Sequence, residues 1–251
     1  VSLTRIARWG GHVDETMALL AHSRELCRQT GDMRSLSYVF FQMIMLAWRQ
    51  GHLDEAARYI EQYIDIRREL SEGRMAPPSG QAMLALLSCE QGAYDRAEAL
   101  CAQALDSPLA GHFARGLAFS ALGRVALCRG DGARAVREYR EALRHMQLEQ
   151  NLHVLDHVEY LAWALAADGQ AGEAARLLGF VGQQREVSGP ALQLVDRPYH
   201  ERALETVRGA LSEADLAGAW AAGEALELEV VVERLLAEAP AADPPTRGEE
   251  E

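Results

Sequence analysis

Four side chains in the second half of the sequence could bind a metal or transfer protons. His153 and His157 lie four residues apart, which places both imidazoles on one face of a helix and is a spacing that can hold zinc. No third ligand is evident nearby in the sequence except Asp156 or Glu159. Two histidines at the exposed start of a helix give the same pattern without a metal. We therefore predict a solvated helix start here and no metal site.

The cysteines and the other nucleophiles show no catalytic pattern. The four cysteines form no CxxC pair, and no signal peptide precedes them; they are Cys27, Cys89, Cys101 and Cys128. Such a set is typical of reduced thiols in the cytoplasm. Cys89 and Cys101 could face each other across one helical hairpin, but buried thiols acting as small hydrophobic side chains explain them better. No serine, cysteine or histidine stands in a nucleophile motif, so we predict no catalytic residue.

The basic residues exclude several further functions. The 251 residues contain no lysine, so all 25 basic side chains are arginine. A P-loop needs a lysine on the phosphates and Schiff-base catalysis needs an amine, so this sequence can contain neither. The formal net charge is −12 and there is no long basic run, which argues against direct binding of nucleic acid. No apolar run reaches the roughly 18 residues of a membrane span. We predict a cytoplasmic protein that is not an enzyme and needs no cofactor.

The sequence contains a repeat, and the helices that this repeat predicts must position any binding site. Five glycines recur at intervals of 38 to 41 residues, each with a small residue five positions later; the pairs are Gly11 and Thr16, Gly51 and Ala56, Gly92 and Ala97, Gly130 and Ala135, and Gly169 and Ala174. Apolar residues flank every glycine at helical spacing, and strong helix formers dominate the composition. Each glycine is expected to end one helix, and the small residue lets the next helix approach closely. Because one hairpin cannot bury its apolar face alone, the sequence predicts an all-α stack of antiparallel helical hairpins.

This pattern resembles the tetratricopeptide repeat, in which a glycine closes the first helix and an alanine follows five positions on. Leu87–Leu105 (LSCEQGAYDRAEALCAQAL) and Ala126–Leu143 (ALCRGDGARAVREYREAL) match that motif, with Ala104 and Ala142 at its later small position. The repeats run about five residues longer than the roughly 34 of the usual motif, and its proline is missing. The resemblance implies a right-handed solenoid with five hairpins over residues 1–176.

After residue 176 the pattern changes to a helix, a proline-bearing loop and three further helices. We expect Ser212 to cap one of these helices, with Asp215 three positions later, and Gly223 to end it. The segment is similar to the C-terminal end of the helical-repeat region in large bacterial ATP-binding transcriptional regulators of the LuxR type, including MalT-like members of the signal-transducing NTPase (STAND) class. The similarity is carried by Leu178, Gly179, Arg185, Pro190, Tyr199, Leu211, Ala219, Trp220, Gly223, Leu226, Leu228 and Glu229.

The resemblance to these regulators implies a role in transcription control and signal transduction. In that family the repeats receive an inducer or a partner and control an NTPase module, and a helix-turn-helix lies at one end. This sequence contains neither a P-loop nor a basic recognition helix after Ala237, so the resemblance implies the sensor or scaffold arm alone. The sequence begins inside an expected helix, and we expect it to be a piece of a longer protein. Residues 177–236 are expected to form a divergent helical cap, and 237–251 a disordered acidic tail.

The resemblance also places a binding groove along the first helices of the hairpins. Positions carried over from the motif by their offset from each glycine give Arg5, Arg8, Tyr38, Phe41, Met45, Trp48, Arg49, Leu86, Cys89, Glu90, Ser120, Arg124, Leu127, Asp156, Glu159 and Trp163. Aromatic rings beside arginines and carboxylates suit recognition of a peptide or a small molecule. We select as groove contacts Tyr38, Phe41, Trp48, Arg49, Glu90, Arg124, Glu159 and Trp163, and interpret Met45 and Leu86 as packing residues.

Three functions are compatible with such a groove. The first is an interaction module that binds a protein or peptide, including other domains of the same regulator. The second is a sensor that closes on a small-molecule inducer, as the MalT-like relatives imply. The third is a free-standing adaptor built from the same repeats. The sequence favours the first and identifies neither the ligand nor the partner.

Overall fold

The computed structural model describes residues 13–70, 77–148, 154–187 and 192–237 of this chain. These residues form α-helices and one short 3₁₀ helix, with no strand among them, so the prediction of an all-α fold is confirmed. The elements are α1 (Val13–Thr30), α2 (Met33–Arg49), α3 (Leu53–Leu70), α4 (Pro78–Glu90), α5 (Tyr94–Asp106), α6 (His112–Cys128), α7 (Gly132–Leu148), α8 (Val154–Ala167), α9 (Ala171–Val187), η2 (Leu194–Asp196), α10 (Arg197–Ala210), α11 (Glu213–Glu224) and α12 (Leu228–Ala237). None of the described helices is long and apolar enough to cross a membrane.

The predicted glycines close four helical hairpins. Gly51, Gly92, Gly130 and Gly169 have φ angles of 70°, 72°, 77° and 80°, and they stand between the paired helices α2/α3, α4/α5, α6/α7 and α8/α9. At the first of these turns the Gly51 amide donates to the Trp48 carbonyl and the following amide donates to Ala47. A β-carbon is disfavoured at such φ angles, which explains the glycine. Gly11, which belongs to the first predicted hairpin, lies outside the described residues.

The small residue of the repeat is buried in each of the four described hairpins. Ala56, Ala97, Ala135 and Ala174 have no exposed surface, as the close-approach prediction requires. Ser212 caps α11 as predicted, because its hydroxyl accepts a hydrogen bond from the Asp215 amide. The helices bury apolar side chains in three neighbouring clusters that follow one another along the stack.

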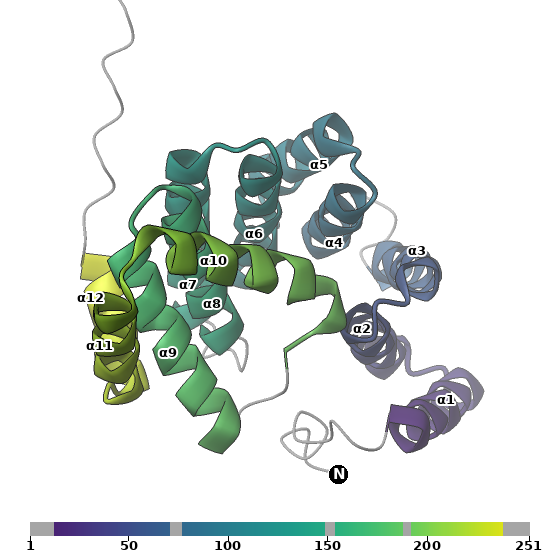
Figure 1. The fold of residues 1–251 in the computed structure, drawn as a ribbon. Coiled ribbons are helices and arrows are strands. Elements are labelled where there is room, and N and C mark those ends of the chain that lie inside the picture. The colour runs from purple at the N-terminus through teal and green to yellow at the C-terminus, as the bar shows by residue number, and fades with distance from the viewer. Residues whose placement is uncertain (1–12, 71–76, 149–153, 188–191, 238–251) are drawn as a thin grey trace, which may run out of the picture.

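The C-terminal helices return to the hairpins. In Figure 1, α11 lies along α9, and α10 crosses the first helices of the hairpins from the side of α9 towards α2. The sequence predicts that Gly223 ends α11, and it lies one residue before the last residue of that helix. That helix runs through Glu224, and Gly223 is not among the glycines with positive φ. Instead it is buried against the backbone of α9, where a side chain has no room.

Candidate functional site

The chain covers part of its own groove. We call residues 192–210 the strap; it comprises η2, α10 and the two residues before them. η2 contacts α2, while α10 contacts α8 and α9. The side of α2, α4, α6 and α8 that faces the strap is called the inner face. The strap therefore occupies a surface where the repeat pattern predicts a partner.

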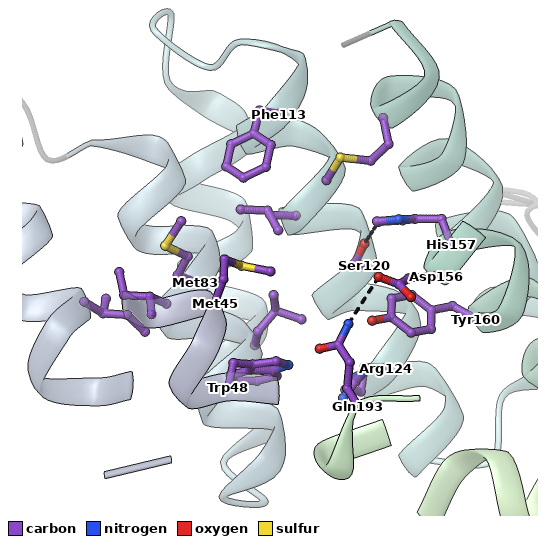
Figure 2. Close-up of a pocket in the computed structure, with 15 residues that line it drawn as sticks. Met45, Trp48, Met83, Phe113, Ser120, Arg124, Asp156, His157, Tyr160 and Gln193 are labelled. Carbon is purple, nitrogen blue, oxygen red and sulfur yellow. Dashed lines mark hydrogen bonds between the residues drawn. The ribbon is translucent and has the colours of Figure 1, made fainter. Parts of the chain in front are cut away.

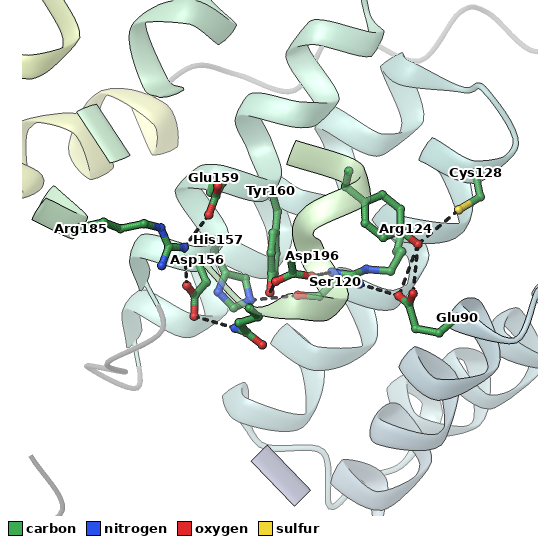
Figure 3. A network of polar contacts seen from close by, with 12 residues as sticks. Glu90, Ser120, Arg124, Cys128, Asp156, His157, Glu159, Tyr160, Arg185 and Asp196 are labelled. Carbon is green, nitrogen blue, oxygen red and sulfur yellow. Dashed lines mark hydrogen bonds and ion pairs between the residues drawn. The ribbon is translucent and has the colours of Figure 1, made fainter. Parts of the chain in front are cut away.

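Arg124 of α6 is the centre of the contact between the inner face and the strap. Its side chain is 2% exposed, and its two terminal nitrogens lie 2.6 Å from Glu90 of α4 and 2.6 Å from Asp196 of η2 (Figure 3). Burial alone would lower the pKa of this guanidinium, but Asp196 and Glu90 raise it. The ion pairs join α4, α6 and the strap at one point.

Aromatic rings surround this ion cluster. The Arg124 guanidinium lies 4.6 Å from the ring centre of Tyr199 and 5.4 Å from that of Tyr160. Tyr199, on α10, stacks on Trp163 at 5.7 Å and donates a hydrogen bond to Glu90 at 3.3 Å. Tyr160 donates to Asp196 at 3.0 Å. Rings of this kind stabilise a desolvated cation through their negative faces.

A second ion cluster holds the other side of the strap. Arg185 of α9 donates to Asp156 at 2.9 Å and to Glu159 at 2.5 Å, both on α8. His200 of α10 donates from Nδ1 to Glu159 at 2.7 Å. The side chain of Gln193, at the start of the strap, donates to Asp156 at 3.2 Å. The buried carboxylates of α8 thus bind both α9 and the strap.

A cavity of about 60 Å³ remains between the inner face and the start of the strap (Figure 2). Its lining is Ile44, Met45, Trp48, Ile60, Met83, Leu86, Phe113, Leu117, Ser120, Arg124, Met146, Asp156, His157, Tyr160 and Gln193. The apolar residues come from the hairpins, and the polar ones gather where the strap begins. A mainly apolar cavity with a few converging polar groups is the usual form of a small-molecule site.

Ser120 and His157 form a pair that resembles a nucleophile and its base, but the Ser120 hydroxyl has a second acceptor. The hydroxyl lies 2.8 Å from the carbonyl of Gly116, to which it donates. While it donates there, its single proton is not donated to His157 Nε2, which lies 2.9 Å away. A base would have to accept that proton instead. The prediction that His157 lies at a solvated helix start is wrong, because the imidazole is buried and bonded.

The described residues contain no group of three or more His, Cys, Asp or Glu side chains placed to hold a metal ion. His153, the other half of the predicted pair, lies outside them. Cys89 and Cys101 are both buried, and burial raises the pKa of each thiol to about 12. Each sulfur donates to a helix carbonyl, Ala121 for Cys89 and Ala118 for Cys101. The prediction that Cys89 and Cys101 are buried thiols is confirmed.

The eight predicted groove contacts do not all lie at one place. Trp48 and Arg124 line the cavity. Glu90, Arg124, Glu159 and Trp163 contact the strap. Tyr38 and Phe41 lie near each other on α2, and Phe41 contacts Phe113 edge-on at 5.4 Å. Arg49 is half-buried at the end of α2. Arg5 and Arg8 lie outside the described residues, and a role of any of these side chains in binding a partner stays a prediction.

The groove positions predicted from the sequence do not include the residues that the strap contributes, chiefly Gln193, Asp196, Tyr199 and His200. Arg185 and Tyr199 belong to the positions that carry the regulator resemblance, but that resemblance assigns them no contact. One available signal was the apolar Val195, which stands between the polar residues of the segment 192–196 and is buried in the fold, although Leu194 beside it is exposed. It could have indicated a buried connection, although not the helices that it covers.

Asp196 makes the stability of this region depend on pH. Its pKa is raised to about 6, chiefly by burial; Arg124 of α6 opposes the rise, and Asp156 and Glu159 of α8 add to it. Its ordinary value is 3.8, so between these values the folded chain binds a proton that the unfolded chain lacks. This contribution is present at low pH and is lost as the pH rises through the folded pKa.

From about pH 7 to about pH 5, we therefore expect the wild type to gain about 1 kcal/mol of stability relative to Asp196→Asn, which cannot titrate. Urea unfolding of both proteins at each pH measures this difference. A difference that stays constant over the range would contradict the expectation. Titrating groups that do not interact with Asp196 contribute equally to both proteins and cancel in the comparison.

No family model matches this chain, and neither a curated protein nor a solved structure matches it. Its function must therefore be inferred from the geometry described above.

Proposed function

We propose that this chain is a non-catalytic sensor module that binds a small molecule in the cavity between its inner face and its strap. The observation that carries the proposal is the cavity itself, whose apolar wall comes from the hairpins and whose polar end includes a residue of the strap. A ligand there contacts both parts at once. Its binding energy can therefore be converted into a change in how firmly the strap is held.

The proposed architecture is a right-handed solenoid like that of tetratricopeptide repeats. The closed hairpins, the glycines with positive φ and the buried alanines support it. The similarity of residues 177–236 to the end of the repeat region in LuxR-type and MalT-like regulators further supports a place as the sensor arm of a transcriptional regulator. In that role the strap links ligand binding to the regulator's other domains.

A second candidate is a groove that binds a partner helix in place of the strap. The observation that favours it is that the inner face already accepts a helix, α10, through ion pairs and stacked rings. The arrangement of Ser120 and His157 supports binding rather than nucleophilic catalysis in both cases. In the second case the strap is a competitor, whereas in the first it is part of the site.

Thermal unfolding with a panel of amines, amides, alcohols, carboxylates and sugars tests the sensor proposal. A ligand at about 100 times its Kd is expected to stabilise the wild type by about 2.7 kcal/mol. Leu86→Phe places a larger side chain at the cavity and should abolish that shift. Leu109→Phe makes the same change at a 60% exposed position and should preserve it.

Two outcomes would decide against the sensor proposal. One is a stabilising ligand that raises the unfolding temperature of Leu86→Phe as much as that of the wild type. The other is a panel without effect, together with binding of a synthetic peptide of α10 sequence to a chain whose strap contacts are broken by Asp196→Ala and Tyr199→Ala. That second result would favour the groove for a partner helix.

A further inference from the structure

An unpaired acceptor faces the cavity from the strap. Gln193 is 4% exposed, and its Oε1 has no hydrogen-bond partner among the described residues. Figure 2 shows this oxygen on the side of Trp48, away from Asp156. A buried acceptor without a partner destabilises the fold, so a donor in the cavity would recover that energy.

Asp156 fixes which end of the Gln193 amide faces the cavity. The Gln193 Nε2 donates to the Asp156 carboxylate at 3.2 Å. An ionised carboxylate only accepts hydrogen bonds, so turning the amide over would set one acceptor against another. Arg185 also lies 2.9 Å from Asp156 and favours its charged form. Gln193 therefore presents a hydrogen-bond acceptor, not a donor, to the cavity.

The two ion clusters next to the polar end of the cavity disfavour binding of an anion there. Arg124 already lies between Glu90 and Asp196, and Arg185 already pairs with Asp156 and Glu159. These two clusters hold four carboxylates and two guanidiniums, so with the carboxylates ionised their net charge is negative. A carboxylate or phosphate would meet guanidiniums that already pair with carboxylates. A neutral or cationic group meets no such repulsion.

The apolar wall sets the size of the molecule. A volume of about 60 Å³ is less than half of the roughly 150 Å³ of a cavity that holds benzene. Three of the apolar side chains are methionines, Met45, Met83 and Met146, whose unbranched thioethers repack readily around different shapes. The cavity thus suits a body of a few carbon atoms.

We propose that the cavity recognises a short, mainly apolar molecule whose polar end carries an N–H donor, an amide or an amine, that binds Gln193 Oε1. This inference rests on the proposed sensor function and specifies its ligand class. The methionines and Trp48 contact the hydrocarbon part, and Gln193 selects the donor. Acids of the same size are rejected by the surplus of carboxylates.

Four probes of similar size test this inference: butyramide, butylamine, butyrate and methyl propanoate. The amide and amine donate N–H bonds, butyrate is an anion, and the ester accepts without donating. An NMR titration that follows the indole N–H of Trp48, assigned with Trp48→Phe, gives the Kd of each. We expect the two donors to bind about tenfold more tightly than the ester, and butyrate most weakly.

Gln193→Met removes the acceptor while keeping the side-chain length. It should bring butyramide and methyl propanoate to similar affinities, mainly by weakening the amide. The order of the four probes in the wild type tests the inference even where this variant does not fold. Tightest binding of butyrate or the ester would overturn the inference and leave small-molecule sensing intact. If none of the four probes shifts the Trp48 signal but larger ligands stabilise the wild type and not Leu86→Phe, the inference is overturned and the sensor function stands. If no such larger ligand is found either, the sensor function fails as well.

Discussion

Replacing Arg124 by methionine is expected to lower the free energy of unfolding by about 3–5 kcal/mol. The guanidinium is buried and faces Glu90 and Asp196, each at 2.6 Å. Methionine fills much of the same space but leaves two buried carboxylates without a counter-charge. It also removes the cation from beneath the Tyr199 ring. Urea unfolding followed by circular dichroism measures the loss.

Arg129 provides a matched control at the end of the same helix. It too pairs with two carboxylates, Asp95 at 2.5 Å and Glu98 at 2.8 Å, and lies 6.0 Å from the ring of Tyr94. Its side chain is 37% exposed, so water and salt screen these pairs. Arg129→Met should cost less than about 1 kcal/mol. Equal losses in the two variants would show that the buried Arg124 cluster does not hold the strap.

Hydrogen exchange locates the effect of Arg124→Met within the chain. If the cluster fastens the strap, the amides of α10 should exchange faster than in the wild type, and those of α5 should change least. The double variant Arg124→Met with Asp196→Leu should recover part of the lost stability, because it removes one uncompensated carboxylate together with its partner. Uniformly faster exchange in every helix would instead indicate loss of general packing.

The hairpins could be predicted because their signals are local. Gly51 and Ala56 are five residues apart, and both conditions that they meet, a left-handed turn and a close helix contact, arise within one hairpin. Gly31 adopts the same conformation, with φ of 68°, between α1 and α2. It lies outside the periodic series of glycines, so the period does not predict it.

The strap could not be predicted in the same way. Arg124 and Asp196 are 72 residues apart, and no local period connects them. The sequence does place Arg124, Glu159 and Trp163 on the inner face. From the sequence, however, a charged side chain on such a face is as consistent with contact to an external partner as with pairing inside the chain. Only the folded chain shows that the strap supplies the pairing groups.

The prediction that His157 is solvated at the start of a helix is wrong for a related reason. Polar residues such as Asp156, His157 and Glu159 at the start of a helix are usually solvated, and the sequence contains nothing to bury them. In the fold, α6 supplies Ser120 on one side, while α9 and the strap supply Arg185 and Gln193 on the other. Their burial is thus produced by elements remote in sequence, and the candidate cavity arises from the same meeting of segments.

Gly223→Ala is expected to lower the free energy of unfolding by about 3 kcal/mol, at the upper end of the usual cost of overpacking. A β-carbon there would overlap the carbonyl oxygen of Arg176 and would lie 2.9 Å from the backbone nitrogen of Phe180. Both neighbours belong to the backbone of α9, which cannot move aside as a flexible side chain can. On the facing helix, Gly179 has the same constraint, with its β-carbon position 2.5 Å from the Trp220 carbonyl oxygen. The alanine therefore has to push α11 away from α9.

Gly218→Ala is the matched control, because it makes the same change on the same helix. A β-carbon at Gly218 meets no heavy atom within 4 Å, so the variant should gain up to about 1 kcal/mol from the higher helix propensity of alanine. Urea unfolding of the two variants should thus move in opposite directions from the wild type. Similar effects in both would mean that α11 does not need its close contact with α9. A loss confined to Gly223→Ala, with faster hydrogen exchange in α11 than in α2, would show that two glycines set the distance between α9 and α11 and hold the end of the stack in place.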